Sequence, residues 1–185
     1  MESLSLEAIE EIDYEVAKRD FKFFFEEILG YQLANHHEHW NNNLEARKRY
    51  CVKAARDHGK STLFLGYMLW KTAFNPKTKA VLISHSLHQS IHHMRTLNDL
   101  IDGVPFLAKM KKPDSWSKTF FGFTNGSNIS AKSVGGAIRG IHPDLILCDD
   151  ILWGTTDTEL ARVASWFYEV LVPTLHHTSK LMIVG

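Results

Sequence analysis

The sequence has little of several features that mark specialised protein classes. Only two cysteines, Cys51 and Cys148, occur in 185 residues, which favours reduced, structural thiols, as expected in the cytosol, over a disulfide framework. No apolar run reaches the ~20 residues needed to span a bilayer as a helix. Lysine plus arginine number 21, as do aspartate plus glutamate, so the formal net charge is zero. Any basic surface for nucleic acid must therefore be local.

The composition that remains is that of a packed domain. Hydrophobic residues make up 44% of the chain and charged residues 23%, which supports a core and argues against disorder. A length of 185 residues fits one α/β domain with a small appendage. Both cysteines fall in segments that we predict to be buried strands. The acidic stretch from Met1 to Glu7 lacks the basic start of a signal peptide.

Helical and strand patterns alternate along the chain. Over residues 1–48 we expect a helical segment packed on the core, with Asp20 capping a helix over 21–29 that Gly30 ends. Residues 49–185 form the predicted core. Its expected strands and helices are strands 50–54, 80–84, 145–148 and 181–184, helices 61–72, 87–101 and 158–170, and a hairpin of 120–123 with 128–132. This alternation predicts an α/β fold with a mostly parallel sheet covered by helices on both faces.

A phosphate-binding loop is the first motif that indicates chemistry. Gly59-Lys60-Ser61 matches the end of the pattern G-x-x-x-x-G-K-[ST], with Ala54 in place of the first glycine. In such a loop, backbone N–H groups and the following helix N-terminus face the phosphates. Lys60 adds positive charge at the β- and γ-phosphates, and the Ser61 hydroxyl can ligate magnesium. The residues expected to contact the nucleotide are Ala55, Arg56, Asp57, His58, Gly59, Lys60, Ser61 and Thr62. The alternative is a chance match in a strand–helix turn.

An apolar strand that ends in two carboxylates is the second motif. The run 145–148 leads into Asp149 and Asp150 at the carboxyl end of a predicted strand, where ligands bind in open α/β sheets. Asp149 fits a magnesium contact through water, and Asp150 fits the group that orients the attacking water. The alternative is a capping pair in a strand–helix loop. Together with the phosphate loop upstream, the pair favours an ATPase.

The combined pattern resembles the large subunit of the tailed-bacteriophage terminase, the motor that pumps DNA into a procapsid. The resemblance covers about residues 30–185 and rests on Arg56 within the loop, on the segment 133–144 that leads into the acidic strand, and on the strand and helix at 80–90. The strand at 181–185 resembles the approach to the family's coupling motif. We therefore expect the chain to stop before that motif and before the family's nuclease domain.

The resemblance implies a P-loop NTPase fold of the RecA/ASCE type that binds ATP and Mg²⁺. Lys60 and Ser61 match the family's phosphate and magnesium positions, Asp149 its second magnesium contact, and Asp150 its catalytic carboxylate, although relatives often carry glutamate there. Arg56 matches a loop arginine assigned to catalysis or nucleotide sensing.

Two further roles carry over from the family. Arg139 matches an arginine proposed as a finger that reaches a neighbouring subunit's nucleotide. His37 matches an adenine contact, a role that His36 or His39 could hold instead.

The family also implies partners and a cellular location. The implied partners are double-stranded DNA, a portal protein and a small terminase subunit, and the implied location is the host cytoplasm, with no membrane association. The chain is expected to form a homo-oligomeric ring in the motor and to be a monomer when isolated. The chain is expected to hydrolyse ATP and translocate DNA but not to cut it. Two other functions remain open, another nucleic-acid-dependent ATPase such as a helicase or recombinase, and a nucleotide-binding scaffold without hydrolysis.

Two residue clusters allow other interpretations. The clustered histidines could suggest zinc, but a polar helix face is the better account. The basic and aromatic segment Lys109 to Lys118 could follow a DNA backbone. A solvated loop with one anchoring tryptophan is the favoured interpretation of that segment.

Overall fold

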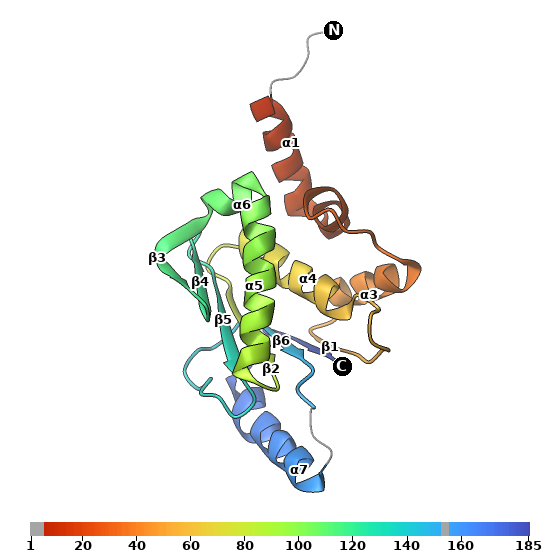
Figure 1. The fold of residues 1–185 in the computed structure, drawn as a ribbon, viewed down its shortest axis with the longest axis vertical. Coiled ribbons are helices and arrows are strands. Elements are labelled where there is room, and N and C mark those ends of the chain that lie inside the picture. The colour runs from red at the N-terminus through yellow and green to blue at the C-terminus, as the bar shows by residue number, and fades with distance from the viewer. Residues whose placement is uncertain (1–5, 153–155) are drawn as a thin grey trace.

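The fold is built around one seven-stranded sheet (Figure 1). The computed structural model describes residues 6–152 and 156–185, so most of the acidic N-terminal stretch lies outside the described residues. The strand order is β1-β7-β6-β2-β5-β4-β3. The strands are β1 (Arg49–Val52), β2 (Lys79–Ser84), β3 (Lys111–Ser117), β4 (Phe120–Phe123), β5 (Asn128–Ser133), β6 (Leu145–Asp149) and β7 (Lys180–Val184).

The first five strands in that order run parallel, and β4 and β3 add an antiparallel edge. Helices connect β1 to β2 and β6 to β7, whereas residues 134–144 connect β5 to β6 without a helix. The helical elements are α1 (Leu6–Arg19), α2 (Phe21–Phe23), the π-helical η1 (Phe24–Ile28), α3 (Asn35–Ala46), α4 (Lys60–Phe74), α5 (Leu87–Gly103), α6 (Pro105–Lys109), α7 (Asp157–Trp166), the π-helical η2 (Phe167–Leu171) and the 3₁₀ helix η3 (Val172–Thr174). The predicted α/β class and mostly parallel sheet are confirmed.

Alternate residues of the central strands pack into two separate cores, as the two-residue period of a strand requires. Leu82 and Leu147 face the core beneath α4 and α5. Ile83 and Cys148 face the other core, which Trp166 of α7 and Leu171 of η2 close. Because both faces are covered, these strands are continuous apolar runs, the pattern that identified them in the sequence.

The N-terminal helices pack on the outer side of α4 through aromatic rings. Phe21 contacts Tyr67 and Trp70 with ring centroids 5.3 and 5.5 Å apart, and the Trp70 indole N–H donates to the Ala17 carbonyl at 2.7 Å. Asp20 caps α2 as predicted, accepting from the backbone N–H groups of the next turn. The predicted single helix over 21–29 instead widens into the π-turn η1. The division of the chain at residue 48 stays a prediction.

Two expectations about the sheet edges are wrong. Cys51 lies in a strand as predicted, but β1 is an edge strand with one neighbour, and its side chain is exposed, whereas Cys148 is fully buried. The segment predicted as a solvated loop forms the edge strand β3, which pairs with β4. The predicted hairpin is present, since β4 and β5 run antiparallel around Gly126 at φ 83°. No helix in the described part of the chain is long and apolar enough to cross a bilayer.

Candidate nucleotide-binding site

The carboxyl edge of the parallel strands holds a polar cavity of about 510 Å³. Segments far apart in the sequence meet there because parallel strands end at the same edge. The phosphate loop follows β1, the N-terminus of α4 follows the loop, and the ends of β2 and β6 close the other side (Figure 1). The residues that line the cavity are Arg56, Asp57, Lys60, Ser61, His85, Ser86, Gln89 and Asp150.

The loop turns where a glycine is required. Gly59 has φ 67°, in the left-handed region that favours glycine, and it precedes the first turn of α4. A Cβ at this position would lie 2.8 Å from Nε2 of His37, so space as well as conformation excludes a side chain. Asp57 also has a positive φ of 63°, a conformation that aspartate adopts more readily than most residues. The loop is therefore closed tightly onto the N-terminus of α4.

Lys60 folds back over its own loop. Its ammonium group donates to the Ala54 carbonyl at 2.8 Å and to the Ala55 carbonyl at 2.6 Å. Both acceptors belong to the loop backbone, so the charge is held at the rim of the cavity. The backbone N–H groups of the first turn of α4 have no partner within the helix, and they are the groups that can bind an anion beside this charge.

Ser61 and Asp149 join the two sequence motifs directly. The Ser61 hydroxyl lies 3.0 Å from Oδ1 and 3.1 Å from Oδ2 of Asp149, although 88 positions separate the residues. Asp149 is buried at the end of β6. A hydroxyl and a carboxylate are the hard oxygen donors that Mg²⁺ prefers, so this pair fits the ion. Within the described ranges no group of three His, Cys, Asp or Glu side chains could hold a metal ion.

Asp150 has a backbone conformation different from its neighbour's. It has φ 49°, and its N–H donates to the Val184 carbonyl at 2.9 Å, which continues the pairing of β6 with β7 by one residue. Asp149 is buried, whereas Asp150 is exposed and lines the cavity. The two adjacent carboxylates therefore have different surroundings.

The predicted arginines lie in different places. Arg56 lines the cavity from within the loop. Arg139 is exposed in the segment between β5 and β6 and is not among the residues that line the cavity.

Two of the three candidate histidines touch the phosphate loop. Nδ1 of His37 accepts from the Ala34 N–H at 3.2 Å, so Nε2 carries the proton and donates to the His58 carbonyl at 2.7 Å. His36 Nε2 lies 3.3 Å from the same carbonyl. His39 instead contacts Asn43 within α3.

Sequence reasoning missed the contribution of the segment after β2. Ser86 and Gln89 line the cavity, and Nε2 of His93 lies 2.6 Å from Oδ2 of Asp149. A signal for His93 was available, because Ser90, His93 and Leu97 recur at helical spacing on what proves to be the buried face of α5.

Cys148 precedes the acidic pair but does not contribute a reactive thiol. Burial raises the pKa of the Cys148 thiol, and the neighbouring Asp149 carboxylate raises it further. The side chain therefore stays a neutral part of the core under the site.

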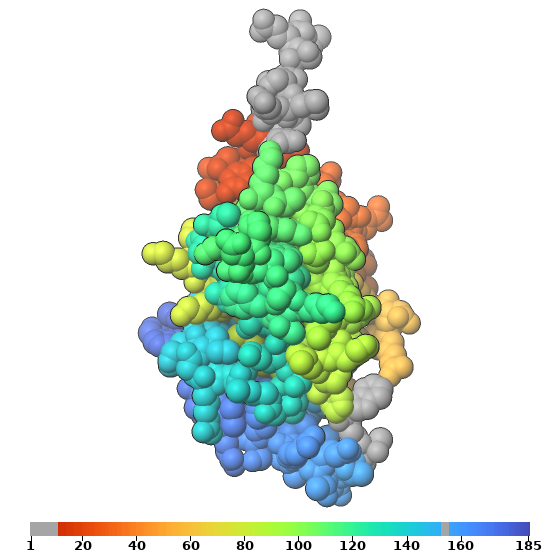
Figure 2. Space-filling model, turned by 60° about the vertical axis from the view of Figure 1, so that its left-hand side comes forward, coloured from red at the N-terminus to blue at the C-terminus, as the bar shows by residue number. Residues whose placement is uncertain are grey.

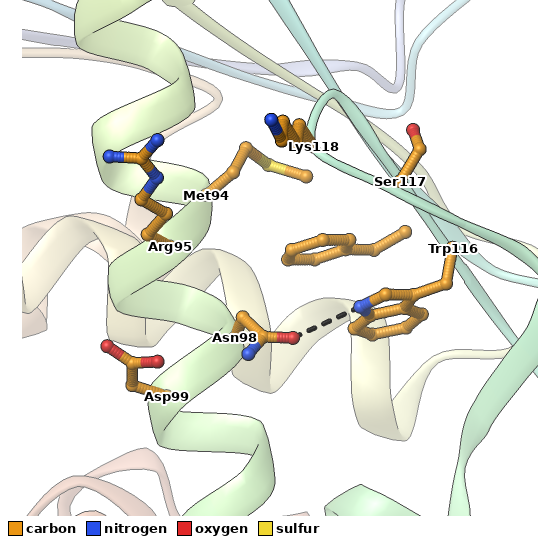
Figure 3. A pocket seen from close by; sticks show the side chains of 8 residues that line it. Met94, Arg95, Asn98, Asp99, Trp116, Ser117 and Lys118 are labelled. Atoms are coloured by element: carbon orange, nitrogen blue, oxygen red, sulfur yellow. Dashed lines mark hydrogen bonds between the residues drawn. The ribbon is translucent and has the colours of Figure 1, made fainter.

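A second cavity of about 230 Å³ lies between α5 and the β3–β4 hairpin (Figure 3). On the face seen in Figure 2 these segments lie side by side. The rings of Trp116 and Phe121 stack at 4.1 Å, and the Trp116 indole N–H donates to Oδ1 of Asn98 at 3.1 Å. Arg95 and Lys118 also line this second cavity. The contact of the basic segment Lys109 to Lys118 with DNA stays a prediction.

Comparison with known proteins finds terminase large subunits of bacteriophages. No family model matches the chain. In sequence it is 27% identical over 151 residues to the terminase large subunit of Enterobacteria phage T3, an alignment that covers 75% of this chain and 25% of that protein. The chain thus spans about a quarter of the length of this relative.

Solved structures share the fold. The large terminase of bacteriophage HK97 superposes with a TM-score of 0.65 at 16% identity, covering 84% of this chain and 33% of that one. The large terminase ATPase domain of Thermus phage P74-26 gives a TM-score of 0.64 at 17% identity, covering 89% and 68%. The chain has the fold of a large-terminase ATPase domain, and its predicted resemblance to the terminase large subunit is confirmed.

Proposed function

We propose that this chain is the ATPase domain of a viral DNA-packaging motor, which hydrolyses ATP to translocate double-stranded DNA into a procapsid. The observation that carries the proposal is the contact between Ser61 and Asp149, at 3.0 and 3.1 Å, beside a cavity that also contains Lys60 and Asp150. A phosphate loop and an acidic strand that meet at one polar cavity are the arrangement that phosphoryl transfer requires.

Each side chain then has a defined role. The backbone N–H groups at the start of α4 and the Lys60 ammonium bind the β- and γ-phosphates, and Arg56 reaches the γ-phosphate from the loop. Ser61 and Asp149 hold Mg²⁺, which when bound neutralises charge on the phosphate oxygens. His37, held against the loop by its hydrogen bond to the His58 carbonyl, is our candidate for the adenine contact.

Asp150 acts on the attacking water. Its carboxylate is exposed to the cavity, so it can accept a proton from a water or orient it toward the γ-phosphorus. Arg139 lies outside this cavity, which suits a residue that serves the site of a neighbouring subunit. We propose a homo-oligomeric ring for this reason, working on the portal protein with a small terminase subunit in the host cytoplasm.

ATP turnover by an Asp150→Asn variant tests the proposal. Removing a general base lowers turnover by about 10²–10⁴-fold, whereas the isosteric amide leaves nucleotide binding intact. Fluorescent-ATP binding and phosphate release are measured on the same preparations, with Asp157→Asn on α7 as the matched control. Normal turnover by Asp150→Asn would show that the base is misassigned. Binding without any turnover by the wild-type chain, even in the presence of procapsids, would favour a nucleotide-binding scaffold.

A further inference from the structure

A buried histidine contacts the carboxylate proposed to hold magnesium. Nε2 of His93 lies 2.6 Å from Oδ2 of Asp149, and the two side chains are only 7% and 3% exposed. At this distance the atom facing the carboxylate must be an N–H donor. Oδ2 therefore accepts from His93, and the single Ser61 hydroxyl hydrogen is shared between Oδ1 and Oδ2.

The position of His93 is fixed by the helix that carries it. Ser90, one turn earlier on α5, accepts from the Ser84 N–H at 3.0 Å and donates to the Lys132 carbonyl at 2.6 Å. These bonds tie α5 to β2 and to β5. Because α5 is fixed to the sheet in this way, the His93 imidazole has a fixed position relative to the end of β6.

A cavity residue meets the same histidine. The Gln89 amide nitrogen lies 3.3 Å from Nε2 of His93, but both atoms are donors, so Gln89 packs against the imidazole without a hydrogen bond while it lines the polar cavity. His93 therefore lies between a side chain of the cavity wall and the buried Asp149 carboxylate.

We infer that His93 is a positioning residue that fixes the Asp149 carboxylate through Oδ2, so that Oδ1 faces Ser61 and the proposed magnesium site. This inference rests on the proposed function, because it concerns the same Mg²⁺–nucleotide site. Buried partners that orient a metal ligand are worth about 10- to 100-fold in metal affinity or activity. His93 does not touch the reacting atoms and acts only through Asp149.

The test measures how metal supports nucleotide binding. Binding of a fluorescent ATP analogue is titrated with Mg²⁺ and repeated in EDTA, and Mn²⁺ binding is followed by electron paramagnetic resonance. His93→Ala is expected to need about 10- to 100-fold more metal for half-maximal binding. Its nucleotide affinity in EDTA should equal that of the wild type. His93→Gln, which keeps an N–H donor at similar reach, should recover most of the metal affinity.

The matched control is His92→Ala, because His92 is the exposed neighbour on the same helix. An unchanged metal titration in a folded His93→Ala would overturn the inference. So would an equal loss of metal affinity in His93→Gln, which also carries the test if the alanine variant does not fold. A wild-type chain without metal-dependent nucleotide binding would overturn the proposed function itself, so the two failures are distinguishable.

Discussion

The two cavities of this domain differ in how they are built. The cavity at the sheet edge collects polar side chains from distant segments, with cationic groups beside hydrogen-bond donors and carboxylates. The cavity of α5 and the β3–β4 hairpin is made by neighbouring segments around stacked aromatic rings, and Oδ1 of Asn98 in its wall already accepts from both Trp116 and Lys111. The first is suited to a charged ligand, and the second is mainly packing.

This difference predicts two kinds of mutational effect. Changes at the first cavity should alter nucleotide chemistry and leave folding intact. Changes at the second should alter the free energy of unfolding and leave nucleotide binding intact.

The largest effect is expected from Arg139, and only in the proposed ring. An arginine finger supplied to a neighbouring site is worth about 10³–10⁵ in rate, so Arg139→Ala should bind ATP normally and fail to gain rate on assembly. ATP turnover is measured as a function of chain concentration and in the presence of procapsids. Arg162→Ala, an exposed arginine on α7, is the control. Brisk turnover by a verified wild-type monomer would remove the need for this arginine.

Lys60→Ala should weaken nucleotide binding by roughly 10- to 100-fold. A hydrogen bond to a charged group contributes about 1.5–3 kcal/mol, and each 1.4 kcal/mol is a factor of ten. Equilibrium binding of fluorescent ATP checks this, with Lys79→Ala at the start of β2, the opposite end of the sheet, as control. Wild-type affinity in Lys60→Ala would mean that the phosphates bind elsewhere.

Trp116→Ala should destabilise the fold by about 2 kcal/mol, less than a fully buried tryptophan would, because the ring is partly exposed. It loses the stack on Phe121 and the bond to Asn98. Urea unfolding measures the loss, and nucleotide affinity should not change. Trp116→Phe keeps an aromatic ring and should lose less stability. A drop in ATP affinity in Trp116→Ala would contradict the separation of the two cavities.

The smallest effect is a difference in thiol reactivity between the two cysteines. Cys51 is exposed, so a thiol reagent should label it in the native protein between pH 7 and 9. Burial raises the pKa of Cys148, so this thiol stays protonated and unlabelled in the native protein over the same range. Mass spectrometry of labelled peptides, with and without denaturant, distinguishes them. If Cys148 in the native protein were labelled as fast as Cys51, the core beneath the nucleotide site would have to open to solvent.

The sequence predicted the parts that depend on local pattern. Buried parallel strands appear as apolar runs, and the phosphate loop and the acidic pair follow fixed spacings, so the fold and the positions of Lys60, Ser61 and Asp149 could be expected. Their meeting at one edge follows from the parallel topology.

What the sequence did not predict depends on contacts between distant segments. β3 is rich in lysine and contains Pro113, a composition that keeps an exposed edge strand from pairing with other chains. The same composition is typical of a loop, so only the pairing with β4 identifies the segment as a strand. Cys51 is exposed because β1 lies at the end of the strand order, which no local pattern specifies. His93 looks like one more polar helix residue until the end of β6 is placed beside it.

The most direct test is a crystal structure with Mg²⁺ and a nonhydrolysable ATP analogue. We expect the triphosphate in the loop before α4, the Lys60 ammonium moved from the Ala54 and Ala55 carbonyls to the phosphates, and the metal between Ser61 and Asp149. Nucleotide bound in the cavity beside Trp116, or a metal that contacts neither Ser61 nor Asp149, would contradict it.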